Sequence, residues 1–277
     1  MPLTTSEQML CDAQHGGYAV GAFNVENMEM AQAVLAAAQE LNAPVIVQTT
    51  PGTIKYAGLD MYYANIAALA KKVSVPVAIH LDHGNSFELA VQAIRAGYTS
   101  HESFEQNINL TGRVVAVAKP NGIPVEAELG KVGGKEDDLD GGNPGYTDPQ
   151  EAQEFVERAG ISSLAVGIGT AHGVYKGTPK LDIDRLKEIR KRVSIPLVLH
   201  GASGLPDSDV IKCIKEGICK VNFATQLRIA FSAGVKELID KQPDSFDPKK
   251  YGAEGREHVK QAVKDLIKVC GCQNHGC

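Results

Sequence analysis

The chain has 277 residues, with 28 Lys and Arg against 33 Asp and Glu and a formal net charge of −5. Hydrophobic residues make up 43% and charged residues 22%, a globular balance that excludes wholesale disorder. The mild acidity argues against a general nucleic-acid binder, which normally carries a basic surface. The sequence shows neither an apolar run long enough to span a membrane nor the pattern of a signal peptide. We therefore expect a cytoplasmic protein that binds neither nucleic acid nor membrane.

Short β-branched runs alternate with helical patterns along the whole chain. The runs are almost continuously apolar, which is typical of a parallel sheet buried on both faces. Strands alternating with helices indicate βα units in a single domain over 1–277, with an α/β fold. Strands are predicted at 18–23, 43–48, 75–81, 123–129, 163–168, 195–200 and 220–224, and helices at 28–41, 86–96, 149–159, 182–192 and 208–216.

An eighth strand would be needed to close a barrel from these units. It belongs after the helix that ends at Gly97, where only 98–100 fits a strand. The residues from His101 to Glu105 are instead predicted to start the next helix. The eighth strand is therefore abnormally short.

Three histidines follow predicted strands, namely His83, His172 and His200. The loops after the strands build the active site of an α/β barrel, so these imidazoles are expected to meet at one mouth. Three neutral imidazoles with an open coordination position suit a catalytic Zn²⁺ ion. His80 lies within an apolar strand and is expected to be a core residue.

Two segments are suited to binding an anion, one because it is rich in glycine and the other because it precedes a helix. The segment 201–204 (GASG) offers backbone N–H groups and one hydroxyl, and the segment 222–225 (NFAT) leads directly into a helix. Phosphate sites after the last two strands are common in barrels. The alternative for each segment is an ordinary turn or helix cap.

Carboxylates accompany the histidines. Asp82 either transfers a proton near the metal or orients an imidazole, and Glu128 lies at a strand end. The stretch 133–146, rich in glycine and acidic residues, is either a solvated turn or a mobile lid that carries a catalytic acid or base. A Schiff-base lysine is not expected, because Lys220 starts its strand rather than ending it.

An ordered series of motifs resembles the class II, metal-dependent ketose-bisphosphate aldolases over nearly the whole chain. The series is far more specific than any one of its members. The matching blocks are YAVGAFN (18–24), HLDHG (80–84), VEAELG (125–130), GGKEDD (133–138), GTAHG (169–173), HGASG (200–204) and VNFAT (221–225).

This resemblance implies a (β/α)₈ TIM barrel that reversibly cleaves a ketohexose 1,6-bisphosphate to dihydroxyacetone phosphate and glyceraldehyde 3-phosphate. It implies an enediolate stabilised by one Zn²⁺ per subunit, and it allows a monovalent cation nearby. Asp82 resembles the acid/base that acts on the hydroxyl, and Glu136 resembles the group that moves the proton at the enediolate carbon. By the same resemblance the metal ligands are His83, His172 and His200, with Glu128 at an alternate metal position. The implied substrate-binding residues are Asn24, Thr50, Gly173, Gly201, Ala202, Ser203, Asn222, Phe223, Ala224, Thr225 and Arg256, the last from a neighbouring subunit.

The sugar and the assembly are less sharply implied. The stretch that ends at His172, the run at Asn222 and the cysteine-rich tail resemble tagatose-bisphosphate aldolases, whereas the Asp-His-Gly at Asp82 resembles the fructose enzymes. We favour tagatose 1,6-bisphosphate over fructose 1,6-bisphosphate. A homodimer or homotetramer is expected, and some tagatose enzymes use a noncatalytic companion subunit. The alternatives are a metal-dependent hydrolase on the same barrel and a noncatalytic role.

One departure from the family falls at the short eighth strand. In the family this strand ends in a segment similar to Met-Ile-Asp-Gly-Ser, directly before the histidine that is His101 here. About six residues are therefore absent between Ser100 and His101. They are either a loop left out of this numbering or a true deletion, which we expect to cripple the barrel. The Asp of that segment has no counterpart.

Six cysteines are too few for a disulfide scaffold in a chain of this length. Cys11, Cys213 and Cys219 are expected to be reduced or buried thiols. The tail 270–277 crowds three cysteines and one histidine into eight residues. Zinc sites usually draw ligand pairs from two separated elements, so we expect a frayed terminus rather than a metal site.

Overall fold

The computed structural model describes residues 3–103, 108–136, 139–142, 145–175, 177 and 179–276. Eight strands, all paired in parallel, form a closed barrel in the order β1-β11-β10-β8-β5-β4-β3-β2. The predicted (β/α)₈ barrel is thus confirmed. The strands are β1 (Val20–Asn24), β2 (Val45–Thr49), β3 (Val77–Gly84), β4 (Ser100–Ser103), β5 (Val125–Leu129), β8 (Ser163–Val166), β10 (Leu197–Leu199) and β11 (Ile218–Phe223).

Helices surround the barrel, and several of them begin at a polar N-cap residue that follows a strand-to-helix loop. The side chains of Asn27, Ser86, Asp148 and Asp182 each accept a backbone N–H of the first helical turn. The helices are α2 (Met28–Glu40), α3 (Pro51–Ala57), α4 (Leu59–Ala70), α5 (Phe87–Ala96), α6 (Ile108–Ala118), the 3₁₀ turn η1 (Lys119–Asn121), α7 (Pro149–Ala159), α8 (Ile183–Arg192) and α9 (Asp207–Lys215).

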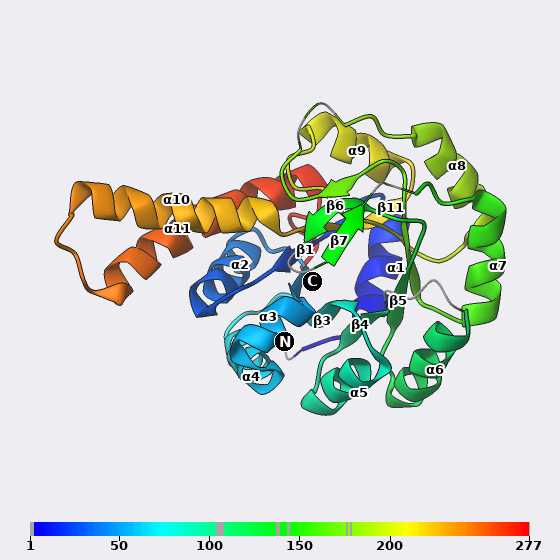
Figure 1. The fold of residues 1–277 in the computed structure, drawn as a ribbon, viewed down its shortest axis with the longest axis horizontal. Helices are drawn as coiled ribbons and strands as arrows, with labels where there is room; N and C mark the ends of the chain where they lie inside the picture. The colour runs from blue at the N-terminus through cyan, green and yellow to red at the C-terminus, as the bar shows by residue number, and fades with distance from the viewer. Residues whose placement is uncertain are drawn as a thin grey trace.

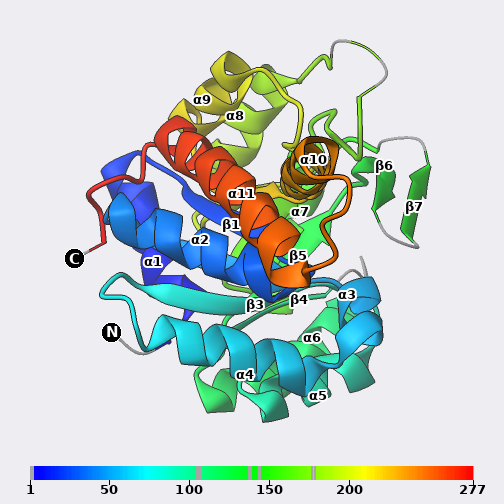
Figure 2. The same cartoon turned by 90° about the vertical axis from the view of Figure 1, so that its left-hand side faces the viewer.

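Three further helices complete the fold. α1 (Ser6–Gly16) covers the end of the barrel where the strands begin, since the hydroxyl of Ser6 lies 2.7 Å from that of Ser100, the first residue of β4. α10 (Thr225–Lys241) and α11 (Pro248–Cys270) form a long hairpin that projects from the barrel, and α11 packs beside α2 (Figures 1 and 2). None of the described helices is long and apolar enough to cross a membrane.

The eighth strand corrects the sequence-based expectation. β4 runs through 100–103, so the residues from His101 start no helix, and α6 begins only at Ile108. Ser100 and His101 both lie in this strand. The ring of eight strands closes with this four-residue β4.

Two other segments are more ordered than expected. Part of the acidic stretch forms an antiparallel hairpin of β6 (Gly133–Glu136) and β7 (Leu139–Gly142), and β6 pairs in parallel with β9 (Ala171–His172). The tail is not frayed. Cys272 is fully buried, and the ring of His275 stacks on Tyr18 with centroids 4.1 Å apart. Cys277 lies outside the described residues.

Candidate active site

The three predicted histidines meet at one end of the barrel. The ring centroid of His83 lies 5.0 Å from that of His172 and 5.0 Å from that of His200, and the last two are 6.3 Å apart. Their ligand-forming nitrogen atoms all lie within 4.8 Å of one another. His83 and His200 are buried, and His172 is half-buried. This donor set, three imidazoles from three strand ends, fits a tetrahedral metal ion with one open position.

A bulge in β3 brings Asp82 and His83 into the same site. In a regular strand consecutive side chains point to opposite faces. Here the register with β4 shifts between Leu81 and Gly84, and His83 has a φ of 54°, in the left-handed region. Two consecutive residues therefore both face the mouth of the barrel.

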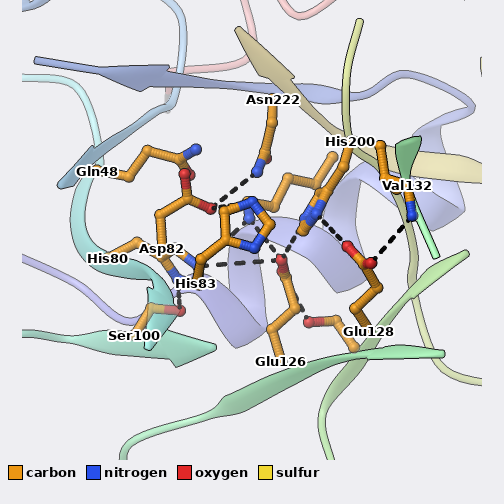
Figure 3. Close-up of polar contacts among 12 residues, drawn as sticks. Gln48, His80, Asp82, His83, Ser100, Glu126, Glu128, Val132, His200 and Asn222 are labelled. Carbon is orange, nitrogen blue, oxygen red and sulfur yellow. Dashed lines mark hydrogen bonds and ion pairs between the residues drawn. The ribbon is translucent and has the colours of Figure 1, made fainter. Parts of the chain in front are cut away.

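The carboxylate of Asp82 is held by amides from two other strands. Asn24 donates from Nδ2 to Oδ2 at 2.7 Å, and Asn222 donates to Oδ1 at 3.1 Å. Gln48 in turn donates to the side-chain oxygen of Asn24 at 2.8 Å. Figure 3 shows the contact between Asn222 and Asp82. Burial raises the pKa of Asp82, but the charges of the nearby histidines and of a buried lysine outweigh it and hold the pKa well below its usual range. Asp82 is thus an oriented carboxylate beside the histidines.

Glu128, at the end of β5, lies against His200. Its Oε2 is 2.8 Å from Nδ1 of the ring, and its Oε1 accepts the backbone N–H of Val132 at 3.3 Å. Burial raises the pKa of Glu128, yet the hydrogen bond to His200 prevails and lowers it to about 2. A carboxylate at this position reaches a metal ligand directly.

The two anion-binding segments lie together beside the histidines. Ser203 Oγ accepts the backbone N–H groups of Ala224 at 3.1 Å and of Gln226 at 3.4 Å, at the start of α10. An anion at this helix start would meet the same N–H groups and the positive end of the helix dipole. A small cavity here is lined by His172, Gly173, Gly201, Ser203, Asn222, Ala224 and Thr225.

The side chain of Tyr175 and close packing of the backbone at Gly134 fix the loops that carry His172 and His200. Tyr175 accepts the N–H of Ala171 at 2.9 Å and donates to the carbonyl of Gly201 at 2.8 Å. A Cβ at Gly134 would lie 2.2 Å from the carbonyl oxygen of His172, so only glycine fits in β6 at this point. Glu136 follows two residues later as the last residue of β6. Its side chain lies outside the described residues.

The remaining predicted residues are placed as follows. Thr50 is buried and caps α3 through the N–H of Thr53. Ala202 is buried. The ring of Phe223 stacks on that of Phe23 in the core, with centroids 5.7 Å apart, so only the backbone of Phe223 could contact a substrate. Arg256 lies on α11, and its guanidinium donates to Gln32 at 3.0 Å.

Several polar residues of the site were not predicted from the sequence. Gln48, Glu126 and Lys220 lie within apolar strands and are fully or almost fully buried. A polar residue that interrupts an apolar strand was the available signal, and His80, noted for the same reason, is confirmed as a core residue at 0% exposure. Tyr175 carried no recognisable signal.

Comparisons with known proteins agree with this geometry. The family model for class-II fructose-bisphosphate aldolase matches residues 4–275. The YdjI aldolase from Escherichia coli K12 is 38% identical with a TM-score of 0.88, over 99% of this chain and 100% of that one. A putative fructose-1,6-biphosphate aldolase from Coccidioides immitis is 29% identical with a TM-score of 0.88, over 97% of this chain and 96% of that one. Fructose-bisphosphate aldolase from Campylobacter jejuni is 25% identical with a TM-score of 0.81, over 99% of this chain and 97% of that one. The chain therefore belongs to the class II fructose-bisphosphate aldolase family, a family of metal-dependent carbon–carbon lyases.

Proposed function

We propose that this enzyme reversibly cleaves a ketohexose 1,6-bisphosphate to dihydroxyacetone phosphate and glyceraldehyde 3-phosphate, with tagatose 1,6-bisphosphate favoured over fructose 1,6-bisphosphate. The observation that carries the proposal is the meeting of His83, His172 and His200 beside an oriented Asp82. Nitrogen ligands with one open position suit Zn²⁺ at this cluster. When bound, Zn²⁺ supplies a Lewis acid for the ketone oxygen, which gains negative charge as the carbon–carbon bond breaks.

In this proposal Asp82 takes the proton from the hydroxyl that becomes the aldehyde. Its lowered pKa keeps the carboxylate ionised, the form that accepts a proton, while the same shift makes it a weaker base. Asn24 and Asn222 hold both of its oxygens, which aims the carboxylate at one place. Glu136, at the end of the strand that pairs with β9, moves the proton at the carbon left by cleavage.

The phosphate next to the ketone is proposed to bind at the start of α10. It would take the place of the Ser203 hydroxyl as acceptor of the N–H groups of Ala224 and Gln226. Glycines at 173 and 201 let a ligand approach the backbone closely. A monovalent cation beside this phosphate and Glu128 as an alternate metal ligand complete the proposed site.

Arg256 is proposed to serve the second phosphate from a neighbouring subunit of a homodimer or homotetramer. It lies on the α10–α11 hairpin, which projects from its own barrel (Figure 1). A companion subunit is compatible with the same surface. Sedimentation of the purified chain would measure the assembly, and a monomer with full activity would contradict this role for Arg256.

The preference for tagatose rests on sequence likeness around His172, around Asn222 and in the tail. Fructose 1,6-bisphosphate is the second candidate, because Asp82-His83-Gly84 resembles the fructose enzymes and two of the similar structures are described as fructose-bisphosphate aldolases. The two sugars differ in configuration at one of the two carbons of the bond that is cleaved.

The decisive experiment measures triose phosphate release from both bisphosphates, before and after chelation and after readdition of Zn²⁺. Cleavage that is lost on chelation and restored by Zn²⁺ is expected, with a higher kcat/KM for the tagatose substrate. A higher kcat/KM for fructose would reverse the preference. A folded, Zn²⁺-loaded protein that cleaves neither sugar would refute the proposal.

A further inference from the structure

A fully buried ion pair spans the interior of the barrel below the histidines. Nζ of Lys220 in β11 lies 2.7 Å from Oε1 of Glu126 in β5, and the two side chains are 0% and 2% exposed. β8 and β10 separate these strands in the barrel, so the pair crosses the interior rather than joining neighbours. Such a pair is a weak source of stability, because desolvating two charges offsets most of their attraction. Its place in the barrel calls for another role.

The pair leads directly to a proposed metal ligand. His200 lies between two carboxylates, with Nε2 3.2 Å from Oε1 of Glu126 and Nδ1 2.8 Å from Oε2 of Glu128 (Figure 3). Glu128 follows Glu126 by two residues toward the end of β5, so Nδ1 faces the mouth of the barrel and Nε2 faces its interior. A metal ion among the three histidines would therefore meet Nδ1.

Glu126 is anchored through both of its oxygens. Lys220 holds Oε1, and the hydroxyl of Ser163 donates to Oε2 at 3.2 Å. Lys220 is itself backed by His80, whose Nε2 is 3.5 Å from Nζ and whose Nδ1 is 2.8 Å from the hydroxyl of Ser100. The carboxylate is thus fixed against Nε2 of His200 and has little freedom to become a metal ligand.

We propose that Glu126, held by Lys220, is a positioning residue for the metal site. It accepts the Nε2–H of His200, so that Nδ1, which lies 2.8 Å from Oε2 of Glu128, would give up its proton and offer its lone pair to a bound metal. The same contact would make the imidazole a stronger donor. A ligating histidine normally passes its second N–H to such an acceptor, and removing the acceptor typically costs about 10- to 100-fold in metal affinity. The proposal rests on the three-histidine metal site proposed above and is independent of which sugar is cleaved.

The test measures Zn²⁺ affinity by chelator competition together with stability by urea unfolding of the metal-free protein. The variants are Glu126→Leu, Lys220→Met and the double variant. Each single variant leaves one buried charge without its partner and is expected to be strongly destabilised, whereas the double variant recovers stability because both charges are gone. We expect Glu126→Leu and the double variant to lose about 10- to 100-fold in Zn²⁺ affinity. Glu126→Gln, which keeps an acceptor for Nε2–H, should recover part of the loss.

Two controls separate this role from a structural one. Tyr98→Phe removes another buried hydrogen bond, the 2.9 Å contact with the hydroxyl of Thr49, and should leave Zn²⁺ affinity unchanged. His83→Ala should abolish tight Zn²⁺ binding. If the double variant recovers both stability and Zn²⁺ affinity, the positioning role is overturned. If His83→Ala binds Zn²⁺ as tightly as the native protein, the metal site itself is wrong and the proposal falls with it.

Discussion

Replacing Gly134 with alanine tests whether the β6–β7 hairpin contributes to turnover through its contact with β9. Gly134 is in register with His172 and has a φ of +82°. An added Cβ would lie 2.2, 2.9 and 3.0 Å from the backbone O, N and C of His172. The oxygen contact is 1.2 Å shorter than the 3.4 Å at which ordinary contact begins, so the two strands must separate by about 1 Å. β6 is expected to move, because Tyr175 holds β9 at Ala171.

A shift of about 1 Å in a group that transfers a proton can lower turnover about 100-fold. We therefore expect Gly134→Ala to reduce kcat to an extent close to that of Glu136→Ala, with little change in Zn²⁺ affinity. The assay is triose phosphate release at saturating substrate, with chelator competition for the metal. Gly112→Ala is the matched control. It lies within α6, where a Cβ meets nothing within 4 Å, and it should keep the native kcat. A native kcat in Gly134→Ala would refute the reasoning.

Three further predictions concern the site itself. Asp82→Asn should lower kcat by about 100- to 10,000-fold, with the metal still bound, because the proton acceptor is lost; an unchanged kcat would exclude Asp82 from proton transfer. Ser203→Ala should raise KM about 5- to 10-fold with a smaller effect on kcat, since it removes the hydroxyl that would donate a hydrogen bond to the phosphate bound at the start of α10; an unchanged KM would contradict this location of the phosphate. The pKa of Glu128 is lowered from 4.5 to about 2. Its stabilising effect is therefore present above the unfolded pKa and lost as the pH falls. Urea unfolding of the metal-free protein should show stability that declines between about pH 5 and pH 2, and the decline should be shallower in Glu128→Gln.

Most of the barrel could be predicted because its strands are apolar on both faces and its helices have clear caps. Seven strands were located within a few residues, from β1 to β11. The eighth strand was expected at 98–100 and lies at 100–103, because the sequence of β4, Ser-His-Glu-Ser, has no β-branched or aromatic residue. Only pairing with β3 and β5 makes this segment a strand. Local propensity carries no information about such long-range pairing.

Some residues of the site could likewise be predicted from the sequence and others could not. The three histidines and Asp82 were predictable because strand ends of a barrel face one mouth. Glu126 and Lys220 were not, because each lies in the interior of an apolar strand. Which strand residues point into a barrel, and which of them meet across it, depends on the stagger of all eight strands. That information appears only when the barrel closes.

The departure from the family at β4 bears on the site more than on the barrel. The bulge that turns Asp82 and His83 toward the same mouth is a register shift between β3 and β4, with Leu81 opposite His101 and Gly84 opposite Ser103. A shorter β4 still completes the ring of strands, because its three pairs with β5 need only 101–103. However, the orientations of His83, a proposed metal ligand, and of Asp82, the proposed proton acceptor, depend on how β3 pairs with β4. An effect of the short β4 is therefore expected first in metal binding and turnover at Asp82 and His83, and it can be measured as Zn²⁺ affinity and kcat.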